Sequence, residues 1–110
     1  MAETLQQYGG VILAEDGTRY YARTCGAEIR GGMWQAWIEF VPVGGGTPIH
    51  TWRETTQPNR VDTVYWATGL SRVYLEGALR RALSGPIVIP TEEIEAPTFD
   101  EPARRTTTDQ

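Results

Sequence analysis

Apolar and polar side chains alternate most regularly over residues 33–43, and this period of two predicts a β-strand. One set of alternate positions is uniformly apolar and is expected to face the core: Trp34, Ala36, Ile38 and Phe40. The other set is expected on the opposite face: Gln35, Trp37, Glu39 and Val41. Proline has no backbone N–H, so the strand should end at Pro42 or run along an edge there.

Three more runs, at residues 11–14, 18–30 and 47–55, are rich in strand-forming side chains. The turns between the four runs contain Asp16-Gly17, Gly31-Gly32 and the three glycines 44–46, which favour tight hairpin connections. The pattern therefore predicts a four-stranded antiparallel meander. Residues 1–8, which precede Gly9-Gly10, are expected to be a flexible lead-in.

After residue 55 the apolar period changes to that of a helix. Thr56 is the expected cap of a first helix that has Pro58 in its first turn and ends at Gly69. Its expected core stripe is Val61, Val64, Tyr65 and Thr68.

A second helix is expected to begin after Ser71 and to end at Gly85-Pro86. Its stripe is Leu75, Ala78, Leu79, Ala82 and Leu83. We predict an α+β fold in which both helices pack on one face of the sheet and the second stripe meets Trp34, Ile38 and Phe40 in the core.

The chain has 110 residues, enough for one domain, which we place at residues 9–90. The segment Ile87-Val88-Ile89 lies between prolines and is expected to be extended, as an edge strand or an arm. Residues 91–110 lack apolar periodicity and are predicted to be a disordered acidic tail. Residues 1–90 contain eight Arg and eight acidic residues, so the net charge of −4 belongs to this tail.

The folded part has a net charge of zero. This neither requires nor excludes an anionic partner, although it disfavours nucleic acid. All ten basic residues are Arg, which we interpret as a codon bias because they are scattered. The N-terminal residues lack the features of an export signal, and the apolar runs are too short to span a bilayer. We therefore expect a cytoplasmic protein with no membrane contact.

Candidate catalytic residues are few. Cys25 and His50 are single residues of their type on different predicted strands, and Glu39 and Glu54 are the carboxylates that two strands could bring face to face. No phosphate-binding motif is present, because the glycines 44–46 lead into a strand. A single cysteine argues against a cysteine-based zinc site. We predict no catalytic, metal or cofactor site, and these residues favour a non-catalytic protein over an enzyme.

The most distinctive polar segment is 52–60, which connects the predicted sheet to the first helix. It is a candidate recognition loop, with these partner-binding residues: Trp52, Arg53, Gln57, Asn59 and Arg60. The alternative is an ordinary strand-to-helix connection, because caps and turns already account for Thr56, Pro58 and Asn59.

Trp37 and Gln35 are further candidate binding residues, because alternation places them opposite the core face. An exposed Trp favours association, so we expect a cover from residues 87–89, a second copy or another protein. An uncovered Trp37 would be a platform on which a nucleic-acid base could stack.

Three functions remain open from the sequence. The first is a non-catalytic protein-interaction or structural module that uses the outward aromatic face, an open sheet edge and the acidic tail, with a protein partner or self-association. The alternative is a single-stranded nucleic-acid-binding domain with stacking Trp and Tyr and scattered Arg. The third is a small carboxylate-dependent enzyme.

Overall fold

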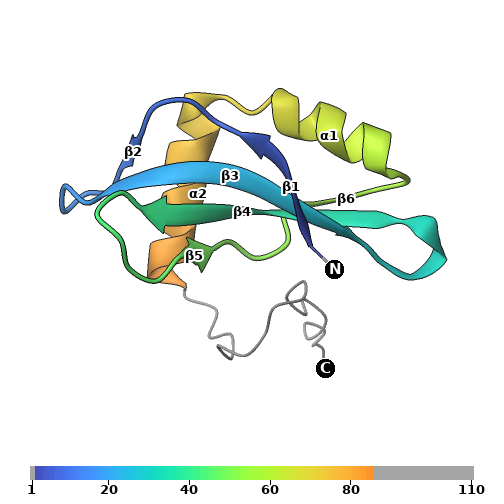
Figure 1. Cartoon of the computed structure of the whole chain (residues 1–110), viewed down its shortest axis with the longest axis horizontal. Coiled ribbons are helices and arrows are strands. Elements are labelled where there is room, and N and C mark those ends of the chain that lie inside the picture. Colours follow the sequence, from blue (N-terminus) through green and yellow to red (C-terminus); the bar gives the residue numbers. More distant parts are fainter. Residues whose placement is uncertain (1, 86–110) are drawn as a thin grey trace.

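Six strands form one antiparallel sheet in the computed structural model, which describes residues 2–85. They are β1 (Glu3–Gln7), β2 (Ile12–Leu13), β3 (Arg19–Glu28), β4 (Trp34–Pro42), β5 (Ile49–His50) and β6 (Thr55–Gln57). The long β3–β4 hairpin is central; β1 and β2 pair with β3, and β5 and β6 pair with β4 (Figure 1). The predicted order of strands is present as β2–β3–β4–β5, and the α+β class is confirmed. The predicted fourth strand over residues 47–55 is shorter than expected, because β5 contains only Ile49–His50 and Thr55 begins β6. The predictions for residues 86–110 lie outside the described residues.

The prediction of a flexible lead-in was wrong, because residues 3–7 form β1 and pair with β3. The register shifts between Thr4 and Gln6. Leu5 lies against Gly26, where an added Cβ would come within 2.6 Å of the Leu5 Cδ1 atom. The lack of a side chain at Gly26 therefore lets β1 pack closely on β3, a tertiary requirement that the polar sequence of β1 does not reveal.

Both helices, α1 (Arg60–Thr68) and α2 (Arg72–Ser84), follow the sheet in the order predicted. Ser71 caps α2 as expected, and its Oγ atom accepts a hydrogen bond from the backbone N–H of Tyr74 at 3.1 Å. The predicted cap of α1 was wrong, because Thr56 lies inside β6. Asn59 caps α1 instead, and its Oδ1 atom accepts from the backbone N–H of Asp62 at 2.8 Å.

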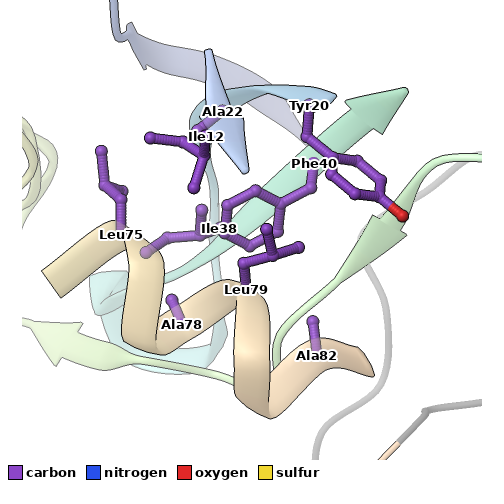
Figure 2. Packing of buried hydrophobic residues seen from close by; sticks show 9 residues of the cluster. All are labelled: Ile12, Tyr20, Ala22, Ile38, Phe40, Leu75, Ala78, Leu79 and Ala82. Atoms are coloured by element: carbon purple, nitrogen blue, oxygen red, sulfur yellow. The ribbon is translucent and has the colours of Figure 1, made fainter. Parts of the chain in front are cut away.

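The core lies between the sheet and α2. Side chains from β2, β3 and β4 point toward the buried stripe of α2 (Figure 2). The Tyr20 and Phe40 rings meet edge to face, with their centroids 6.4 Å apart. The cluster consists of Ile12, Tyr20, Ala22, Ile38, Phe40, Leu75, Ala78, Leu79 and Ala82.

Trp34 does not join this cluster, contrary to the prediction. It is partly buried at the start of β4, where the Arg60 guanidinium lies 5.9 Å from the centroid of its ring. Leu83 also stays outside the core, because it lies one turn beyond Leu79, and its exposed fraction is 44%.

The predicted core stripe of α1 is also wrong. Val61 and Tyr65 are 74% and 80% exposed, whereas Thr63 and Ala67 are buried. The Tyr8 hydroxyl donates to the Ala67 carbonyl at 2.7 Å and accepts a hydrogen bond from the Thr24 hydroxyl at 2.7 Å, which ties α1 to β3. Polar anchoring thus decides which face of α1 is buried.

Candidate functional site

The segment from β5 to α1 carries the residues that the sequence marked as a recognition loop. Three of them make hydrogen bonds within the fold instead. Gln57 donates to the Thr55 hydroxyl at 2.7 Å, and Asn59 caps α1. Arg60 binds both carboxylate oxygens of Glu3 at 3.0 and 3.1 Å. These contacts support the alternative interpretation, an ordinary connection, for this part of the segment.

Trp52 and Arg53 lie at the surface of the same segment. Trp52 is exposed and Arg53 is partly buried. The neighbouring Thr51 is buried, accepts a hydrogen bond from the Ile38 backbone N–H at 3.1 Å, and donates to the Trp52 carbonyl at 2.7 Å. The segment is therefore fixed to β4 at Thr51, directly before the exposed Trp52.

Trp37 and Gln35 face away from the helices, as alternation predicts, but both are buried. Trp37 is only 3% exposed and forms a cluster with Cys25 and Ala27, against which Ala2 packs. A ring buried to this extent offers no flat surface to a base. Trp37 is therefore covered, and the alternative of an uncovered stacking platform at this residue is not supported.

Glu54 is the centre of a polar network that the sequence analysis missed. Its side chain is 6% exposed and accepts a hydrogen bond from the Tyr74 hydroxyl. The Arg81 guanidinium binds the same carboxylate at 2.7 and 3.2 Å and lies 5.8 Å from the centroid of the Tyr74 ring. Tyr74 and Arg81 are seven residues apart and share one face of α2, a spacing that indicates a common partner.

This network is a closed set of donors and acceptors. Burial, followed by the hydrogen bond to Glu54, raises the pKa of Tyr74 to about 12, so the phenol keeps its proton at neutral pH. Both carboxylate oxygens of Glu54 are already bound within the fold. The arrangement fixes α2 to the segment between β5 and β6, and it leaves no free base for proton transfer.

The candidate carboxylate pair is separated by the sheet. Glu39 lies between the core residues Ile38 and Phe40, so it points to the face away from the helices, where its Oε1 atom is 2.6 Å from Arg23. Glu54 instead binds residues of α2. The two carboxylates therefore cannot act together as acid and base.

Cys25 lies beside Glu39, with its Sγ atom 3.8 Å from the Glu39 Oε1 atom. His50 is opposite Glu39 in the register of β4 and β5, so the two candidate residues share one face of the sheet. However, burial and the Glu39 charge raise the pKa of the Cys25 thiol to about 12. The attacking species in cysteine catalysis is the thiolate, which is scarce at neutral pH with this pKa.

Within residues 2–85, no group of three or more His, Cys, Asp or Glu side chains lies close enough together to hold a metal ion. No helix in this part of the chain is both long enough and apolar enough to cross a membrane. Comparisons with protein families, with functionally described proteins and with solved structures find no match to this chain.

Proposed function

We propose that this protein is a non-catalytic protein-interaction module that contacts a protein partner through the outer face of α1. The observation that carries the proposal is the exposure of Val61 and Tyr65, which lie one helical turn apart on the same face. Aromatic side chains are enriched at protein interfaces, and a tyrosine contributes area at low cost in side-chain entropy. The first partner to test is a second copy of the chain, bound through this face.

Charge favours a protein over nucleic acid as the partner. Two arginines that would flank a nucleic-acid strand, Arg23 and Arg60, are already paired with Glu39 and Glu3. Affinity for nucleic acid depends largely on phosphate neutralisation, and these two pairs remove positive charge that would contribute to it. Together with the burial of Trp37, this weakens the nucleic-acid alternative.

The test compares the full-length protein with the double variant Val61→Ser/Tyr65→Ser. Val73→Ser is the matched control, because Val73 is also an exposed apolar residue but lies at the start of α2. Sedimentation velocity measures self-association, and an affinity pull-down from the lysate of the source organism, with and without nuclease, measures other partners. We expect wild type and V73S either to self-associate or to retain a partner protein in stoichiometric amount. We expect V61S/Y65S to lose this association.

Two results would contradict the proposal. The first is that V61S/Y65S retains the same proteins as wild type. The second is that partners are captured only while nucleic acid is intact, which would support the nucleic-acid alternative.

A further inference from the structure

A groove of about 360 Å³ lies between the turn that joins β2 to β3 and the last two turns of α2. Its volume is at the low end of the range for ligand sites in proteins, enough for an anchoring side chain and its neighbours. The residues that define it are Leu13, Glu15, Asp16, Glu76, Arg80 and Leu83. Its lining contains no residue of α1 and therefore none of the outer face of that helix.

The apolar part of the groove is accessible. Leu13 ends β2 and is 54% exposed, and Leu83 extends the stripe of α2 beyond the core. The buried Leu79 lies between them in the lining of the groove. Two exposed leucines on either side of a hollow can bury apolar area when a side chain enters between them.

The rim is predominantly acidic. Glu15, Asp16 and Glu76 contribute three carboxylates, whereas Arg80 is the single basic residue of the lining. The Asp16 Oδ1 atom accepts a hydrogen bond from the Thr18 backbone N–H at 2.9 Å, and this bond lowers the pKa of Asp16. Glu76 is balanced by Arg72 at 3.2 Å, so the other charged residues of the lining are Glu15 and Asp16 on the side of the turn and Arg80 on α2, which leaves a net negative charge.

The turn that carries this charge is fixed. The Ala14 backbone N–H donates to the Thr18 carbonyl at 2.9 Å, and the Gly17 N–H donates to the Ala14 carbonyl at 3.0 Å. A rigid site loses less conformational entropy when it binds. The acidic rim is therefore held in place before a ligand arrives.

We propose that this groove binds a short basic peptide segment of a partner, with an aliphatic or aromatic side chain between Leu13 and Leu83 and flanking Lys or Arg beside Glu15 and Asp16. Charge complementarity selects this occupant. The chain's own residues 91–110 have six acidic residues and two Arg, the same sign as the rim, and therefore fit it poorly. The proposal does not depend on the outer face of α1, so either surface can fail alone.

The test uses three synthetic peptides and the ¹⁵N-labelled full-length protein. The peptide RRLWLRR carries both features, EELWLEE reverses the charge, and RRSGSRR removes the apolar anchor. Each is titrated to ~1 mM, a range suited to weak binding, and backbone amide shifts are followed by NMR. We expect saturable shifts with RRLWLRR that centre on residues 13–16 and 79–84, and at least tenfold weaker binding of the other two peptides.

Matched variants locate the site. We expect Leu13→Ser/Leu83→Ser and Glu15→Arg each to weaken RRLWLRR binding at least fivefold. Val73→Ser and Glu28→Arg should leave it within twofold, because Val73 is at the opposite end of α2 and Glu28 at the opposite end of β3. Unchanged amide spectra show whether each variant retains the fold.

Three results would overturn the proposal. One is no saturable shift with RRLWLRR, and another is equal binding of EELWLEE. The third is that the variant Ile87→Ser/Ile89→Ser binds RRLWLRR at least tenfold more tightly than wild type. This would show that residues 87–89 of the chain itself, and not a partner's peptide, are the natural occupant of the groove.

Discussion

The two helices have similar apolar patterns but bury them in opposite ways. α2 packs Leu75 and Leu79 against the sheet, whereas α1 exposes Val61 and Tyr65 and buries Thr63 and Ala67. The difference lies in what fixes each helix. α2 has apolar contacts over its length in addition to its polar contacts with Glu54, whereas α1 is attached mainly by polar contacts, the Arg60–Glu3 pair at its start and the bond to the Ala67 carbonyl. An apolar stripe therefore marks a core contact in α2 and a free surface in α1.

The largest expected effect on stability distinguishes the buried apolar residues of α2 from the exposed apolar residues of α1. Leu79→Ala should lower the free energy of unfolding by about 2–5 kcal/mol, because it leaves a cavity at a fully buried position. Val61→Ala should change it by less than about 0.5 kcal/mol, because the side chain is already in water. Urea unfolding followed by tryptophan fluorescence measures both. Equal losses would show that the α1 stripe is part of the core.

Alkaline pH tests the polar attachment of α2. The pKa of Tyr74 is raised to about 12 from its usual value of 10.0, so above pH ~10 the unfolded chain loses a proton that the folded chain keeps. Stability should therefore be complete below pH 10 and fall as the pH rises to 12. Allowing for the partial exposure of Tyr74, its share should be about 1 kcal/mol.

Cys25 has a raised pKa as well, so the alkaline titration is best made in a Cys25→Ala background. In that background Tyr74→Phe should reduce the slope of stability against pH between 10 and 12. Tyr65→Phe, on the exposed face of α1, is the matched control and should leave the slope unchanged. The interpretation fails if both substitutions have the same effect.

The cap of α1 should matter more to local than to global stability. Asn59→Ala should cost about 1 kcal/mol, because the Asp62 backbone N–H loses its acceptor. Ser71→Ala removes the equivalent cap of α2. Because α2 also has apolar contacts, hydrogen exchange should show faster opening of α1 in N59A and little change in α2 in S71A. Uniform acceleration across both helices in N59A would contradict this distinction.

The sequence predicted the elements whose pattern and packing agree. Alternation predicted β4, glycine residues predicted the turns, and the helical period predicted α2. Each of these patterns is local in the sequence, so the meander and the second helix could be placed. β1 could not, because its sequence is polar and its pairing depends on the contact between Leu5 and Gly26. A glycine in a strand gave no indication of which segment approaches it.

The candidate site was harder to predict than the fold. Gln57 bonds to the Thr55 hydroxyl within the segment, Asn59 to the backbone of α1 and Arg60 to Glu3 of β1. Without these contacts, the row of polar residues resembled a free recognition loop. Glu54 was placed on a strand opposite Glu39, and only the three-dimensional path of the chain shows that it reaches Tyr74 and Arg81. Alternation gave the correct face for Trp37 but not its burial.

The smallest expected effect on stability tests whether the exposed apolar residues of α1 serve binding and not folding. V61S/Y65S should change the free energy of unfolding by less than about 0.5 kcal/mol, because the two side chains are 74% and 80% exposed and contribute little to the core. Thermal unfolding of the variant and of V73S measures this directly. A stable variant that no longer associates would assign the apolar residues of α1 to a partner, since they do not support the fold. A variant that unfolds at a clearly lower temperature would show instead that this face stabilises the chain itself, and the proposed interaction surface would lose its main support.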